Sequence, residues 1–243
     1  MERYVLITRT AKDCKDLQAL LEDADIRPRP FPVLRLEEHV DRPGWKRVQR
    51  RLSSTKDGRT WLLLTSPRAP NRLVAQARSR EADQLLAWPT ATVGPSTSRA
   101  ARDAGLRVDV EGEGSGAGLA RVLIERWREP TTAVLAGGVH LRPELPAALE
   151  QAGHRILKLK VYAMRATPQR ELPNVGPSHA VILTSPRAAQ HYLEAVGGLP
   201  LPIPHWALGP TTRDAAAGLG IECRIPDEPT MESLAEALKT DLL

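Results

Sequence analysis

The six residues Leu64-Thr65-Ser66-Pro67-Arg68-Ala69 occur twice in this chain, returning unchanged as Leu183-Thr184-Ser185-Pro186-Arg187-Ala188. Each copy follows a short apolar run and precedes a helix-like segment. A second pair, Val93-Gly94-Pro95-Ser96-Thr97 and Leu208-Gly209-Pro210-Thr211-Thr212, follows in the same order at a similar spacing. This spacing is far longer than the ~20–50 residues of solenoid repeats. The sequence therefore predicts a duplicated α/β unit.

Short apolar runs bounded by glycine and proline alternate with helix-like segments, a pattern typical of parallel, doubly wound sheets. The predicted strands are Tyr4–Thr8, Trp61–Thr65, Thr92–Gly94, Val108–Val110, Ala133–Ala136, Ala180–Thr184, Trp206–Gly209 and Glu222–Ile225. The predicted helices are Cys14–Ala24, Ala69–Glu81, Thr97–Ala104, Leu119–Trp127, Glu144–Ala152, Ala188–Val196, Thr212–Gly218 and Met231–Lys239. We therefore expect an α/β protein with two doubly wound parallel-sheet lobes.

Two extended segments, Pro30–Glu37 and His154–Arg165, do not fit a compact strand–helix unit. Both suit strands longer than the common ~5–6 residues. We expect them to connect the lobes, at about residues 33–38 and 159–167. The chain would leave lobe one, build all of lobe two, and return. Lobe one is then discontinuous, formed by residues 1–34 and 167–243, and lobe two is residues 38–163.

Composition excludes several classes of protein. No run in the 243 residues approaches the ~18 apolar residues of a membrane span, and an early Arg9 interrupts any signal-peptide core. We therefore expect a cytoplasmic protein with no membrane partner. The two cysteines, Cys14 and Cys223, predict neither a disulfide framework nor a metal site. The net charge of +5 is compatible with nucleic acid, but the basic residues are scattered and the aromatic content of only 4% argues against base-stacking surfaces, so we expect no nucleic-acid partner. The charge leaves open an anionic small molecule or a solvated arginine-rich surface.

The repeated turns follow strands and open helices, and ligands bind at that edge of parallel sheets. Helix starts attract anions, and the hydroxyls of Thr97 and Thr212 add donors. The same threonines would also serve as ordinary N-caps, and both readings stay open. In the other pair of turns, Ser66 and Ser185 suit the cap, and the prolines after them suit the first helical position. The glycine-rich stretch 112–118 is expected to be a flexible loop, and no metal-ligand spacing or phosphate loop is present.

On these residues the chain resembles the uroporphyrinogen-III synthase family over nearly its whole length. The resemblance rests on Thr8-Arg9 after the first strand and on the Thr-Ser-x-x-Ala turns in both halves. It also rests on the two Gly-x-x-Thr turns and on Tyr162 at the end of the return connector. One departure is Ala136-Gly137, where the family often has Arg-Gly; Arg142 further along still fits.

The resemblance implies two α/β lobes joined by a two-stranded β-ladder, with the active-site cleft between them. It implies that linear hydroxymethylbilane loses its hydroxyl, that ring D is inverted through a spiro intermediate, and that the macrocycle closes as uroporphyrinogen III. No cofactor or metal is implied. We expect a monomeric hydro-lyase of heme and porphyrin biosynthesis. The alternative is a two-lobed binding module or sensor for an anionic small molecule.

The substrate carries eight carboxylates, which suits cationic and hydroxyl-bearing turns. Catalysis would consist mainly of positioning ring D against the ring A methylene. Tyr162 is the predicted catalytic residue, as a phenol donor that assists departure of water. The predicted substrate-binding residues are Arg9, Thr65, Ser66, Thr97, Arg142, Thr184, Ser185 and Thr212.

Overall fold

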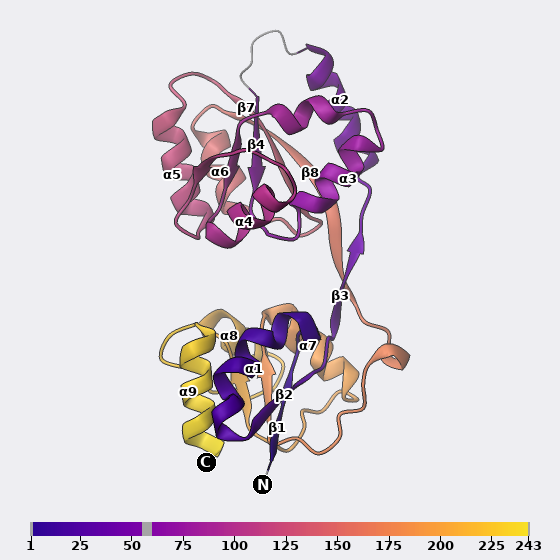
Figure 1. The fold of residues 1–243 in the computed structure, drawn as a ribbon, viewed down its shortest axis with the longest axis vertical. Helices are drawn as coiled ribbons and strands as arrows, with labels where there is room; N and C mark the ends of the chain where they lie inside the picture. Colours follow the sequence, from indigo (N-terminus) through magenta and orange to yellow (C-terminus); the bar gives the residue numbers. More distant parts are fainter. Residues whose placement is uncertain (1, 55–59, 243) are drawn as a thin grey trace. The chain divides into compact units, whose positions relative to one another are not determined.

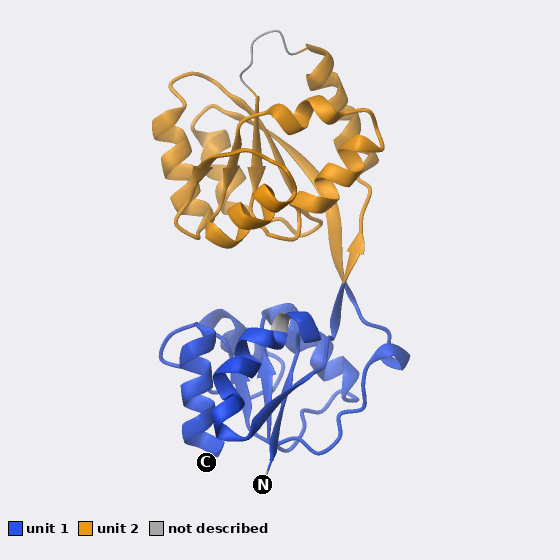
Figure 2. Cartoon of the chain, in the orientation of Figure 1, with its two compact units in different colours: residues 1–35, 165–243 blue, residues 36–164 orange. Residues whose placement is uncertain are grey.

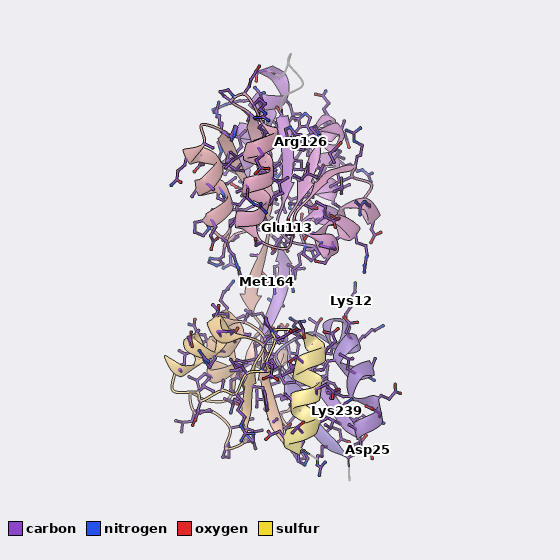
Figure 3. All side chains as sticks on the ribbon, turned by 90° about the vertical axis from the view of Figure 1, so that its left-hand side faces the viewer. Lys12, Asp25, Glu113, Arg126, Met164 and Lys239 are labelled. Carbon is purple, nitrogen blue, oxygen red and sulfur yellow. The ribbon has the colours of Figure 1, made fainter. Side chains whose placement is uncertain are left out.

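The computed structural model describes residues 2–54 and 60–242, except the side chain of Asp13, and the chain divides into two compact units (Figure 2). Unit 1 consists of Met1–Arg35 and Arg165–Leu243, and unit 2 of Leu36–Met164. The chain enters unit 2 through β3 (Leu34–Glu38) and leaves it through β8 (Arg155–Ala166). These two strands are neighbours in one sheet, and Figure 3 labels Met164 on the returning strand. Unit 1 is therefore discontinuous in sequence.

Unit 1 is built on a sheet with the strand order β10-β9-β1-β2, in which neighbouring strands are parallel. Its strands are β1 (Arg3–Ile7), β2 (Ile26–Pro30), β9 (Ala180–Leu183) and β10 (His205–Ala207). One face packs against α1 (Lys15–Leu21) and α9 (Met231–Leu242). The other face packs against α7 (Pro186–Ala195) and α8 (Pro210–Ala217). Three 3-10 turns complete the unit: η1 (Ala11–Cys14), η2 (Glu22–Ala24) and η4 (Gln169–Glu171).

Unit 2 is built on a sheet with the strand order β3-β8-β7-β4-β5-β6, of which Figure 1 labels β3, β8, β7 and β4. Its remaining strands are β4 (Thr60–Leu64), β5 (Thr90–Thr92), β6 (Val108–Glu111) and β7 (Thr132–Gly138). One face carries α2 (Arg42–Ser54), α3 (Pro70–Arg78) and α4 (Pro95–Asp103), with η3 (Asp83–Ala87) beside them. The other face carries α5 (Gly116–Arg126) and α6 (Glu144–Gln151).

This arrangement confirms the predicted α/β fold with two mostly parallel, doubly wound sheets. The reason is visible in β4, where Leu62, Leu63 and Leu64 are all fully buried. Successive side chains of a strand point to opposite faces, so a continuous apolar run requires helices on both sides. Leu62 and Leu64 join the cluster under α2 and α3, and Leu63 joins the cluster under α5 and α6.

Two strand predictions in unit 1 are wrong. The segment Ile26–Pro30 is a strand, although it contains two prolines and was expected to be extended only from Pro30. It is the edge strand beside β1, where the missing proline N–H groups cost no pairing. Conversely, Glu222–Ile225 forms only an isolated bridge between Arg224 and Trp206. Pro226 follows and has no N–H to extend that ladder.

In unit 2, helix α2 was not predicted, and β5 lies two residues earlier than the predicted strand Thr92–Gly94. The basic stretch within α2 hides a short apolar face, since Trp45 and Val48 are buried against the sheet. Strand β5 ends at Thr92 rather than extending to Gly94, because Gly94 is already the N-cap of α4. None of the helices in the described ranges combines the length and apolar character that a membrane span requires.

The two repeated turns start their helices at different points. In the second copy Pro186 is the first residue of α7, and the Ala189 N–H donates to the Ser185 carbonyl at 3.0 Å. The matching position in the first copy is Pro70, which has no N–H for that first helical bond. Helix α3 therefore begins at Pro70, one residue after the predicted start at Ala69, and the expectation that Pro67 takes the first helical position is wrong.

Candidate active site

A cavity of about 520 Å³ opens at the carboxyl edge of the unit 2 sheet. Its walls come from the turns after β4, β5 and β7, from the first residues of α5 and α6, and from β8. Four predicted site residues from separate parts of the sequence line it: Thr65, Ser66, Arg142 and Tyr162. The fold thus brings together four of the nine predicted binding and catalytic residues, all within unit 2.

Tyr162 is held in the wall of this cavity by an irregularity in the β7–β8 pairing. Lys160 pairs with Gly137, whereas Tyr162 pairs with Gly138, so Val161 is an extra residue in β8. Such bulges re-aim side chains and are common beside active sites. The Tyr162 carbonyl accepts from the Val139 N–H at 2.9 Å, which fixes the backbone after the bulge.

The aromatic ring of Tyr162 lies directly over Gly138. A Cβ added to Gly138 would stand 2.9 Å from Tyr162 Cε2 and 3.2 Å from its hydroxyl oxygen. Only glycine therefore leaves room for the ring at this place. The side chain is 8% exposed, and its hydroxyl has no hydrogen-bond partner among residues 2–54 and 60–242. Among the described residues, the enclosed side-chain atoms without a partner are the indole nitrogens of Trp127 and Trp206, so the Tyr162 hydroxyl is instead open to the cavity and available to a bound molecule.

Thr65 and Ser66 enter the cavity from the turn after β4, and both are half-buried. The Ser66 hydroxyl accepts from the Arg68 N–H at 3.2 Å, within a tight turn closed by the Ala69 N–H on the Ser66 carbonyl. Both serines were predicted to cap the helices that follow them. Ser185 is the N-cap of α7, which confirms that prediction, whereas Ser66 is not the N-cap of α3, because α3 begins later. The hydrogen atom of the Ser66 hydroxyl remains available for donation to a ligand.

The glycine-rich segment before α5 forms a second wall that the sequence analysis did not assign to the site. Hydrogen bonds from the Gly112 and Gly114 N–H groups to the carbonyls of Thr92 and Val93, at 2.8 and 2.7 Å, tie this loop to the end of β5. A Cβ on Gly94 would lie 3.0 Å from the Gly114 Cα, so the close approach needs glycine. Ser115 then caps α5 by accepting from the Gly118 N–H at 3.0 Å.

Two helices begin at the cavity. Ser115, Gly116 and Ala117 line it from the start of α5, and Glu144 and Leu145 from the start of α6. Figure 3 labels Glu113 just before α5 and Arg126 at the other end of that helix. The first N–H groups of a helix have no intrahelical acceptor, and the helix dipole adds partial positive charge there. The cavity is therefore suited to anions such as carboxylates.

The ionisable side chains of the cavity are His140, Arg142 and Glu144, all exposed. Arg142 supplies a planar guanidinium that can bind a carboxylate through two hydrogen bonds. Ala136, where the family often has arginine, is fully buried in the core of unit 2. A long charged side chain therefore has no room at position 136, and Arg142 is the arginine that lines the cavity.

The remaining predicted residues of unit 1 lie around the carboxyl edge of its own sheet. Arg9 follows β1, Thr184 and Ser185 follow β9, and these strands are neighbours. The hydroxyl oxygens of Thr8 and Thr184 are 3.3 Å apart, and the Thr8 hydroxyl is 3.0 Å from the Ile182 carbonyl oxygen. Thr8, which was not among the predicted binding residues, thus fixes the position of Thr184.

Thr97 and Thr212 do not cap their helices. The caps are Gly94 and Gly209, and both threonines lie at the third helical position with 1% and 6% exposure. The proline after each glycine sets this earlier start, because its fixed backbone angle suits the first helical residue. Thr97 does not line the cavity of unit 2.

The strongest pKa shifts lie outside the cavity, in unit 1. Burial raises the pKa of Tyr192 to about 12 and that of Cys223 to about 11, and burial lowers the pKa of His205. Tyr192 and His205 are joined by a 2.8 Å hydrogen bond, so these groups form a buried structural network. Within the described part of the chain, no three His, Cys, Asp or Glu side chains form a group that could hold a metal ion.

The fold and the cavity define a two-unit α/β protein with a cavity, suited to anions, at the carboxyl edge of a parallel sheet. Residues 15–236 match the family described as uroporphyrinogen-III synthase HemD. The chain belongs to the uroporphyrinogen-III synthase family. It is accordingly a cyclising lyase of tetrapyrrole biosynthesis that acts on a small tetrapyrrole substrate, and the alternative of a binding module without catalysis is set aside.

Solved structures show the same fold. The chain is 21% identical to a mutant uroporphyrinogen III synthase from Thermus thermophilus, with a TM-score of 0.59 and coverage of 99% of this chain and 98% of that one. It is 14% identical to uroporphyrinogen-III synthetase from Helicobacter pylori, with a TM-score of 0.68 and coverage of 99% and 100%. Among curated proteins, none matches the chain significantly.

Proposed function

We propose that the cavity of unit 2 holds hydroxymethylbilane during its cyclisation and that Tyr162 assists departure of the hydroxyl group. The observation that carries this proposal is the position of Tyr162. Its ring is fixed over Gly138 in the cavity wall, and its hydroxyl has no partner within the described residues. A fixed donor aimed at a ligand cavity is what general-acid assistance requires.

Carboxylate groups of the substrate are bound by three kinds of donor in this cavity. Arg142 contributes charge, Thr65 and Ser66 contribute hydroxyls, and the starts of α5 and α6 contribute backbone N–H groups. The apolar side chains of Val93, Leu141 and Leu145 line the same space and suit the face of a pyrrole ring. This combination of donors and apolar surface supports binding of a molecule that is aromatic and polyanionic.

The chemical step then needs little beyond orientation. The pyrrole nitrogen of ring A supplies the electron pair that breaks the carbon–oxygen bond of the hydroxymethyl group. Tyr162 donates a proton to the departing oxygen, which leaves as water, and the proton lost when the last pyrrole regains aromaticity restores the phenol. Holding ring D against the resulting methylene can contribute up to ~7–11 kcal/mol.

Within unit 1, we assign a second anion-binding edge to Arg9, Thr184 and Ser185. Ser185 already accepts from the Ala188 N–H at 3.2 Å, but its own hydrogen stays available. Thr97 and Thr212 are assigned to packing at the helix starts, because both are buried.

The proposal also includes a monomer acting in the cytoplasm. Cys14 and Cys223 do not form a disulfide, and burial raises the pKa of Cys223, so its thiol is unreactive at neutral pH. Both features suit a reducing compartment.

A cavity-filling variant tests the proposed site. Ala117 lines the cavity near the start of α5 and is exposed, so Ala117→Trp places an indole in the cavity with little effect on the core. The matched control is Ala147→Trp, an exposed position in α6 that does not line the cavity. We expect Ala117→Trp to raise the KM for hydroxymethylbilane or abolish formation of the macrocycle with inverted ring D, while the control stays active. Equal activity of both variants would place the reaction elsewhere.

A further inference from the structure

The extra residue of the β8 bulge has an unusual hydrogen-bonding environment. The Val161 carbonyl accepts from the His39 N–H at 3.4 Å and from the Gln76 side-chain amide at 3.2 Å. The adjacent residue is Tyr162, whose ring direction depends on the backbone at this bulge. The amide of Gln76 therefore contacts the backbone that aims the cavity phenol.

Gln76 lies on α3 and is 1% exposed. Its amide oxygen accepts from the Trp45 indole N–H at 3.0 Å, and this donor-only partner sets the orientation of the amide. Its amide nitrogen then faces three acceptors: the Val161 carbonyl, the His39 carbonyl at 3.0 Å and the Glu38 carboxylate at 3.2 Å. Every polar atom of this buried amide has a partner.

Burying an amide costs free energy of desolvation, whereas an apolar side chain fills the same space without that cost. Fully satisfied polar groups do fix the position of what they bind. Here the fixed elements are the bulge of β8 and the chain just after β3, both of which belong to unit 2. Neither Gln76 nor Trp45 lines the cavity, so Gln76 does not contact the substrate there.

We propose that Gln76 is a positioning residue for Tyr162: by binding the Val161 carbonyl, it holds the bulge that aims the phenol at the substrate. This inference rests on the proposed function, because it requires Tyr162 to act in the reaction. A role in stability alone would instead make Gln76 one more contributor to the core of unit 2.

The test is a double-mutant cycle between Gln76→Met and Tyr162→Phe, read as kcat for the inverted macrocycle and as Tm. Methionine keeps the length of the side chain and removes both the amide oxygen and the amide nitrogen. The matched control is Val48→Ala, which truncates a fully buried residue of the same core and leaves the hydrogen bonds to the Val161 carbonyl in place. If Gln76→Met does not fold, Gln76→Asn takes its place, because it keeps the amide and withdraws it from the Val161 carbonyl.

We expect Gln76→Met to lower kcat about 10-fold, with KM changed less than about twofold, since small displacements of a catalytic group are costly. Val48→Ala should lower Tm with kcat retained, and Gln76→Met should cause no further loss of kcat in the Tyr162→Phe background. Two results would overturn the positioning role of Gln76 and leave the proposed function standing. One is that Gln76→Met lowers kcat as much in the Tyr162→Phe background as in the wild type, and the other is that Gln76→Met retains the same kcat as Val48→Ala. Normal kcat in Tyr162→Phe by itself would overturn the proposed role of Tyr162 in the reaction, and the positioning role of Gln76 with it.

Discussion

Replacing Gly138 by alanine displaces Tyr162 without changing its chemistry. The added methyl group would stand 2.9 Å from Cε2, 3.0 Å from Cζ and 3.2 Å from the hydroxyl oxygen of the tyrosine. Ordinary contacts of a Cβ begin at 3.4 Å, so the ring must move by roughly half an ångström. The β-strand backbone of Gly138 itself accommodates alanine, because this residue is not among those with positive φ.

Two consequences follow from that displacement. Overpacking of this kind costs about 1–3 kcal/mol of stability. At ~4 °C per kcal/mol, Tm should fall by about 4–12 °C. Turnover should fall about 10-fold, because a displacement of ~1 Å can cost about 100-fold.

The assay is formation of the macrocycle with inverted ring D, measured below the Tm of the variant. The control is Gly218→Ala at the end of α8, where an added Cβ meets nothing closer than 3.5 Å and φ is −62°. That variant should keep both its turnover and its Tm. Wild-type turnover in Gly138→Ala would refute the argument that the place of the Tyr162 ring governs the reaction.

Three further predictions concern charge, capping and pH. Arg142→Gln should raise KM severalfold, and the increase of KM with salt should be smaller in this variant. Glu144→Gln should lower KM, since it removes a negative charge from the same cavity. Steady-state kinetics at low and high ionic strength check both variants. Ser185→Ala removes the cap of α7 and should cost about 1 kcal/mol in thermal unfolding. Burial lowers the pKa of His205 below its usual 6.5, so the unfolded chain binds this proton more readily. Stability should therefore be complete above about pH 6.5 and fall at lower pH, and His205→Gln should flatten that slope in Tm measurements.

The fold could be predicted from the sequence largely because buried parallel strands leave a strong signal. Runs such as Leu62–Leu64 and Val181–Leu183 have no polar residue and require helices on both faces of their sheets. The edge strand β2 left no such signal, because its prolines are tolerated only through its place in the sheet. The edge position of β2 depends on the tertiary structure and cannot be predicted from the local sequence pattern.

The site could be predicted only in part. Thr65, Ser66, Arg142 and Tyr162 do line one cavity, because each follows or lies on a strand that ends at the same sheet edge. The contribution of Ser115 and the helix starts was missed, since the glycine-rich stretch matches no phosphate-binding motif. The close approach of Gly94 to Gly114 explains those glycines, and it is visible only in three dimensions.

Sequence identity between repeats also proved a weak guide to local structure. The two Leu-Thr-Ser-Pro-Arg-Ala turns differ in one later residue, Pro70 against Ala189. That difference removes a single backbone donor and moves the helix start by one turn. The sequence does show that Pro70 lacks the N–H that Ala189 donates, but the identity of the two six-residue motifs does not reveal this difference.

The central claim, that the Tyr162 hydroxyl assists the leaving group, is tested most directly by the kcat of Tyr162→Phe with hydroxymethylbilane. This change keeps the ring over Gly138 and removes only the donor. General-acid help is typically ~10²–10⁴-fold, and a good leaving group needs less, so kcat should fall by about 10–100-fold with Tm unchanged. Wild-type kcat in the folded variant would contradict the account and leave positioning of the bilane as the whole of catalysis.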